Sequence, residues 1–214
     1  MVEGNKPDLV AGKKIYILLS QTGTVVSRLI KRVTHAEYNH ASIALDKTLS
    51  PCYSFARKYK YFPIWGAFVT EAPDRGTFKR FRGTQACVLS LDVTDEQYLS
   101  IKNRLEEMYS NRKNYHYNYG GLFSAYFKKV RRKKNHYYCS EFVNELLEQS
   151  GVIPAGHLGE IVQPVDFLKL AKAQVVYRGL LRNYGENRGE SEGEIILRAA
   201  EKGEANAVNP GFSS

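Results

Sequence analysis

Short apolar segments separated by polar ones are the main pattern along the chain, and they predict β-strands. Lys14 to Ser20 is an apolar run rich in Ile and Tyr, which is typical of a buried strand. Ala41 to Leu45 alternates between larger and smaller side chains and also predicts a strand. Four further segments are expected to be strands, namely Cys52 to Ala56, Ala67 to Glu71, Ala86 to Leu91 and Gln174 to Arg178.

Other segments have the spacing and end signals of helices. Thr94 and Gln97 have the pattern of a capping box, which opens a helix reaching about Ser110. Gly151 is expected to end a helix over Ser140 to Gln149, whose apolar residues share one face. The remaining expected helices are Thr24 to Val33, Leu122 to Lys129, and a short one from Pro164 to near Ala171.

The order of these elements indicates the fold class. Strands come first, most helices follow, and a strand comes last, which favours an α+β fold with an antiparallel sheet and helices packed on one side. A length of 214 residues, 43% of them hydrophobic and 25% charged, suits one globular domain. From Asn183 the composition shifts to Gly, Glu and Asn. We therefore expect one domain over residues 1–182 and a flexible or loosely docked tail over residues 183–214.

The hydropathy of the chain predicts neither a membrane span nor a secretion signal. No apolar run approaches the roughly 20 residues that cross a bilayer. The segment from Met1 to Lys14 lacks the apolar core of a signal peptide. The expected location is therefore the cytoplasm.

Basic residues outnumber acidic ones by 31 to 22, which gives a formal net charge of +9. The densest basic cluster is the run from Lys128 to Lys134. Such a run is either a surface that attracts an anionic membrane, a nucleic acid or an acidic substrate, or an ordinary solvated segment. The charge by itself does not select among these partners.

Three cysteines that lie far apart restrict the chemistry. Cys52, Cys87 and Cys139 form no CxxC pair, so a zinc ribbon, a thioredoxin-type site and a disulfide framework are not expected. Cys139 comes just where the helix over 140–149 begins. Unpaired N–H groups and the dipole at a helix start favour the thiolate, which is the nucleophilic form of cysteine. The alternative is a cysteine that only packs in the core.

His40 directly precedes the strand predicted over 41–45, where it can face a neighbouring helix end. The segment Tyr-Asn-His-Ala-Ser-Ile-Ala-Leu at 38–45, followed by Tyr-Tyr-Cys-Ser-Glu-Phe-Val at 137–143, resembles the permuted papain-like amidases. This group is related to the NlpC-type cysteine peptidases and includes the YiiX-like proteins. In papain the cysteine helix precedes the histidine strand. In the permuted group the cysteine helix follows the histidine strand, and the present sequence has this second order.

The resemblance covers roughly residues 14–170 and implies both a fold and an activity. The implied fold is a circularly permuted papain-like fold, with Cys139 as the nucleophile and His40 as its general base. Glu71 is the best match to the third triad residue, which orients the imidazole, and Ser54 and Asp46 remain alternatives. No cofactor and no metal are implied. The expected reaction is hydrolysis of an amide or ester bond, through a cysteine thioester, in a small amide, peptide or lipid-like substrate.

Two other functions stay open on the same residues. A lipid-directed acyltransferase of this fold would form the same thioester and pass the acyl group to another acceptor. A catalytically silent basic module would bind an anionic membrane or nucleic acid through Lys128 to Lys134, since a fold can persist without its activity. A Cys139 that reacts with a thiol reagent ahead of Cys52 and Cys87 would favour an enzyme over the silent module.

Overall fold

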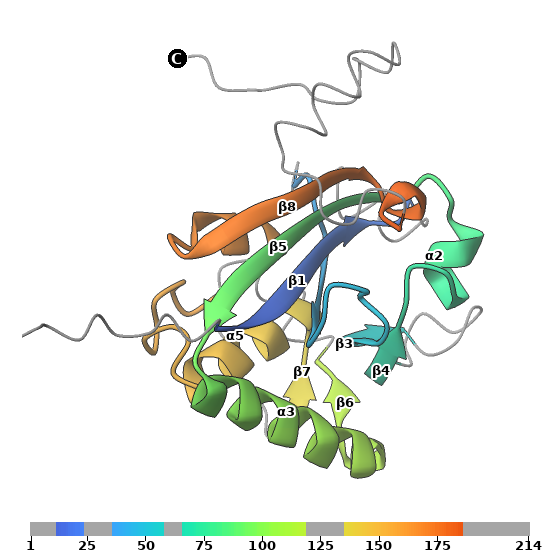
Figure 1. Cartoon of the computed structure of the whole chain (residues 1–214). Helices are drawn as coiled ribbons and strands as arrows, with labels where there is room; N and C mark the ends of the chain where they lie inside the picture. Colours follow the sequence, from blue (N-terminus) through green and yellow to red (C-terminus); the bar gives the residue numbers. More distant parts are fainter. Residues whose placement is uncertain (1–11, 24–35, 58–65, 119–134, 186–214) are drawn as a thin grey trace, which may run out of the picture.

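The computed structural model describes residues 12–23, 36–57, 66–118 and 135–185. An open sheet of eight strands, in the order β7-β6-β4-β3-β2-β1-β5-β8, forms its centre (Figure 1). Neighbouring strands are antiparallel, except for the parallel pair of β6 and β7. The strands are β1 (Lys13–Gln21), β2 (His40–Ala44), β3 (Cys52–Arg57), β4 (Gly66–Glu71), β5 (Gln85–Val93), β6 (His116–Tyr117), β7 (His136–Tyr137) and β8 (Ala173–Leu180).

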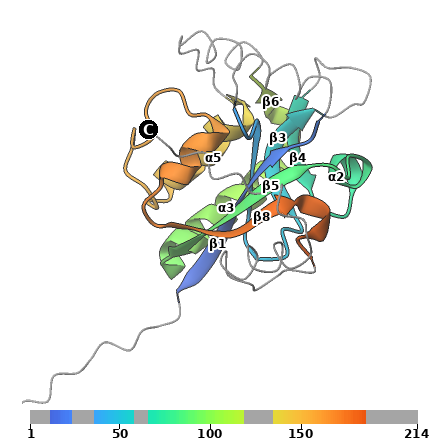
Figure 2. The ribbon, with the colours of Figure 1, turned by 90° about the horizontal axis from the view of Figure 1, so that it is seen from above.

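Two helices cover one face of this sheet. α3 (Asp95–Ser110) and α5 (Cys139–Gln149) lie on the same side of the molecule, away from α2 (Figure 2). Their apolar residues join those of β1, β2 and β5 in the larger core cluster. The expected α+β class with an antiparallel sheet is therefore confirmed.

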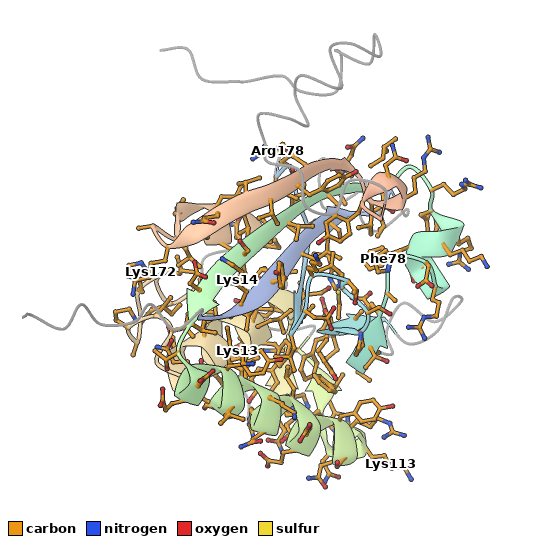
Figure 3. The ribbon with its side chains drawn as sticks, viewed as in Figure 1. Lys13, Lys14, Phe78, Lys113, Lys172 and Arg178 are labelled. Atoms are coloured by element: carbon orange, nitrogen blue, oxygen red, sulfur yellow. The ribbon has the colours of Figure 1, made fainter. Side chains whose placement is uncertain are left out.

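A second, smaller apolar cluster fills the opposite face. Leu18 and Val88 of the sheet pack there with Phe78, which points from α2 (Gly76–Arg80) toward the sheet (Figure 3). Tyr184, which follows the short 3₁₀ helix Leu181–Asn183, also packs in this cluster. Its hydroxyl donates a hydrogen bond to the carbonyl of Lys47 at 2.7 Å. The buried core thus includes a residue inside the range that composition assigns to the tail.

The predicted elements agree with the structure to within a few residues where both can be compared. The capping box at Thr94 is present, with Gln97 N–H donating to the threonine hydroxyl and the Gln97 side chain accepting from Thr94 N–H. Gly151 follows the end of α5 with a positive φ of 69°. The segment after Pro164 is a 3₁₀ helix, Pro164–Lys169. The helices expected over 24–33 and 122–129 lie outside the described residues.

Among the described residues, no helix combines the length and the apolar character that crossing a membrane requires. Cys52, Cys87 and Cys139 all lie in the described part of the chain, and none of them forms a disulfide bond.

Candidate active site

Cys139 is the first residue of α5, and local contacts fix the start of this helix. The carboxylate of Glu141 accepts a hydrogen bond from Tyr138 N–H at 3.3 Å, so one backbone donor at the helix start is satisfied. The hydroxyl of Ser140 donates to the carbonyl of Val162 at 2.7 Å and ties the first turn to the following loop. These contacts hold Cys139 in a buried position, with 3% of its surface exposed.

Phe142 anchors α5 on the sheet close behind Cys139. Its ring lies 5.3 Å from that of Phe55 and 5.5 Å from that of Phe68, measured between centroids, and both partners come from adjacent strands. Tyr137 packs on the same cluster, at 5.1 Å from Phe55. Aromatic groups of this kind bury large areas at defined angles. The helix start is therefore set against β2 and β3, which α5 contacts.

His40 and Glu71 meet across three strands. His40 is the first residue of β2 and Glu71 the last of β4, and β3 lies between these strands. The register pairs Ala44 with Cys52, and Cys52 with Glu71. His40 Nε2 lies 2.8 Å from Glu71 Oε2, and the two side chains are only 15% and 14% exposed. The structure thus brings these two predicted residues into direct contact.

The thiol of Cys139 completes the group. It is hydrogen-bonded to the His40 side chain, and the backbone N–H groups of Ala41 and Ser140 donate to its sulfur. Because Glu71 engages Nε2 of the imidazole, Nδ1 is the nitrogen left for the thiol. All three residues of the predicted triad therefore form one continuous hydrogen-bonded chain.

A local opening in the sheet makes Ala41 N–H available to the sulfur. β2 and β3 pair at Ile43–Tyr53 and Ala44–Cys52, and no further pair follows in the described part of these strands. Beyond that point Ala41 has other partners. Its carbonyl accepts a hydrogen bond from the Ser54 hydroxyl at 3.1 Å, and its N–H donates a hydrogen bond to the sulfur of Cys139. The side chains of Ser54 and Cys139 thus take the place of ladder hydrogen bonds.

The electrostatics of the group favour a thiolate–imidazolium pair. Burial opposes the charge of His40, but Glu71 and Cys139 outweigh it and raise the pKa of His40 to about 10. Burial also opposes the thiolate, yet the hydrogen bond and charge of His40, with the two backbone donors, lower the pKa of Cys139. The pKa of Glu71 is lowered too, because His40 and Ser42 outweigh the effect of its burial.

The two alternatives for the third residue have different places. Ser54 is fully buried, and its hydroxyl lies 3.3 Å from His40 Nε2, farther than Glu71. The carboxylate of Asp46 accepts two hydrogen bonds from Thr48, one from its backbone N–H at 2.7 Å and one from its hydroxyl. Asp46 therefore stabilises the turn after β2. Of the three candidates, Glu71 makes the shortest contact with the imidazole.

Ser42 is the part of this site that sequence reasoning missed. Its hydroxyl donates to Glu71 Oε2 at 2.9 Å and lies 3.3 Å from His40 Nε2. The signal was present, because residues two apart on a strand share a face and Ser42 follows His40 by two positions. Among the described residues, no group of three or more His, Cys, Asp or Glu could hold a metal ion. The basic run from Lys128 to Lys134 lies outside the described residues.

Comparison with known proteins adds no relative to this picture. No protein-family model, no curated protein and no solved structure matches the chain.

Proposed function

We propose that this chain is a cysteine hydrolase of the circularly permuted papain-like type, which cleaves an amide or ester bond. The observation that carries the proposal is the buried hydrogen-bonded chain from Cys139 through His40 to Glu71. A nucleophile, a base beside it and a third group that orients the base are the three parts that such catalysis needs.

The first half of the reaction forms a thioester. The thiolate of Cys139 attacks the carbonyl carbon of the substrate, and the carbonyl oxygen becomes an oxyanion. The backbone N–H of Cys139, at the positive end of α5, is the donor we assign to that oxyanion. The imidazolium of His40 then gives its proton to the leaving amine or alcohol, and the bond to the leaving group breaks.

The second half releases the acyl group. His40, now neutral, takes a proton from a water molecule, and the resulting hydroxide attacks the thioester carbonyl. The C–S bond breaks and a carboxylic acid leaves. Glu71 stays ionised throughout and stabilises the imidazolium whenever it forms.

The structure offers a matched internal control for the nucleophile. Cys52 is also fully buried, but its thiol donates to the carbonyl of Leu49 at 3.1 Å, and burial raises its pKa. A low pKa makes a thiol reactive at neutral pH, so Cys139 should react with a thiol reagent well before Cys52.

The test is iodoacetamide labelling of the folded chain at pH 6.5, with the modified cysteine located by peptide mass spectrometry. The same protein is screened against amide and ester substrates, together with Cys139→Ala and the control Cys52→Ala. Fast labelling of Cys139, and turnover that Cys139→Ala alone abolishes, would support the proposal. Equal slow labelling of both cysteines would exclude it. Transfer of the acyl group to a lipid acceptor rather than water would instead indicate an acyltransferase.

A further inference from the structure

Three oxygen atoms surround Nε2 of His40. Glu71 Oε2 lies at 2.8 Å, and the hydroxyl oxygens of Ser42 and Ser54 each lie at 3.3 Å. Ser42 comes from β2 and Ser54 from β3, and both are fully buried. The nitrogen is thus enclosed by acceptor atoms from three neighbouring strands.

The protons of the two hydroxyl groups are already committed. Ser42 donates to Glu71 Oε2 at 2.9 Å, and Ser54 donates to the carbonyl of Ala41 at 3.1 Å. A hydroxyl has one proton to donate, so neither serine has a second one for Nε2. An ionised carboxylate has none. Nε2 must therefore carry the proton in this arrangement, which leaves Nδ1 to exchange a proton with the thiol.

We propose that Ser42 and Ser54 are positioning residues, which hold His40 with Nε2–H directed at Glu71 and Nδ1 directed at Cys139. This inference rests on the proposed function, because it concerns the base of that reaction. Ser42 also fixes the carboxylate of Glu71 against rotation. Ser54 links the imidazole to the carbonyl of Ala41. The N–H of the same residue donates a hydrogen bond to the sulfur of Cys139.

Ser20 supplies a buried serine that lacks the contact to the imidazole. It is fully buried and lies opposite His40 in the β1–β2 register. Its hydroxyl has no hydrogen-bond partner among the described residues. Ser20→Ala therefore removes the same atom at the same depth, one strand away, without removing a contact to the imidazole or to Glu71.

The experiment compares Ser42→Ala, Ser54→Ala, the double variant and Ser20→Ala. Two quantities are measured: the pKa of His40 by NMR of histidine-labelled protein, and the rate of Cys139 alkylation against pH. A hydrogen bond to a charged group corresponds to about tenfold or more in an equilibrium constant. We expect the protonation constant of His40 to fall by about tenfold in the double variant, with a lower alkylation rate at pH 7. Ser20→Ala should match the wild type.

Conservative variants separate the loss of a hydrogen bond from a defect in folding. Ser54→Thr retains the hydroxyl and should restore the wild-type pKa. If an alanine variant fails to fold, the corresponding Ser→Cys variant, which has nearly the same volume and a weaker donor, is read by NMR alone. An unchanged His40 pKa in the double variant, or the same fall in Ser20→Ala, would overturn the inference. A wild-type Cys139 no more reactive than Cys52 would instead refute the proposed function.

Discussion

Replacing Glu71 by Gln removes one charge from the site and leaves its shape nearly intact. The amide oxygen of Gln can still accept from His40 Nε2, so the change isolates the electrostatic part of the 2.8 Å contact. An opposite charge this close shifts a pKa by about 1–3 units. Each unit corresponds to about 1.4 kcal/mol, so the ionised imidazole should lose about 1.4–4 kcal/mol.

The sign of the effect follows from which form Glu71 stabilises. The carboxylate favours the imidazolium, so its loss lowers the pKa of His40 from about 10. The equilibrium between the thiolate–imidazolium pair and the neutral pair shifts toward the neutral pair by the same factor, about 10-fold to 1000-fold. Less thiolate is then present at neutral pH, and Cys139 should react more slowly.

The assay is an NMR titration of His40, identified by the loss of its signal in His40→Gln, together with iodoacetamide kinetics at pH 7. Glu107→Gln is the control, since Glu107 is exposed on α3 and forms a salt bridge with Arg104 away from the site. A His40 pKa that stays near 10 in Glu71→Gln would refute the electrostatic reasoning. A comparable fall in Glu107→Gln would do the same.

Three further outcomes follow from the packing, the helix start and the titration of the site. Phe142→Ala should lower the free energy of unfolding by about 3–5 kcal/mol in urea titrations, because it empties the aromatic cluster under α5; a loss below about 1 kcal/mol would contradict that role. Thr94→Ala should cost about 1 kcal/mol by thermal unfolding, since it removes the cap of α3, whereas Thr94→Ser should cost little. His40, whose pKa rises from 6.5 to about 10 on folding, contributes stability that is fully present below pH 6.5 and is lost as the pH rises toward 10. The lowered pKa of the Cys139 thiol acts in the opposite sense over the same pH range. The loss should therefore appear in urea unfolding of Cys139→Ala at pH 6.5 and 9.5, and it should be smaller when His40→Gln is added to that variant.

The sequence by itself predicted the longer elements of the fold. Strands such as 14–20 and 86–91 are apolar over most of their length, and the helix after Thr94 carries its own cap, so local pattern was enough to find them. Strands β6 and β7 were not predicted, because each has only two residues, too few for any periodicity. α2 escaped because five residues show no helical repeat.

The geometry of the candidate site was predictable in part, because its residues carry chemistry that is visible in local context. Cys139 lies at the start of a helix and His40 at the start of a strand, and the local sequence pattern predicts both elements. The choice among Glu71, Ser54 and Asp46 as the partner of His40 could not, because nothing local in the sequence says which strand end faces the imidazole.

Only the tertiary structure decided that arrangement, and strand pairing is the reason. The sheet order places β3 between β2 and β4, and Glu71 reaches His40 across β3 although the register sets it level with Ala44. Asp46 instead accepts a hydrogen bond from Thr48 in the turn after β2. The end of the β2–β3 pairing frees Ala41 N–H for the sulfur. Register and the point where a ladder stops depend on contacts between residues far apart in the chain, so local pattern does not contain them.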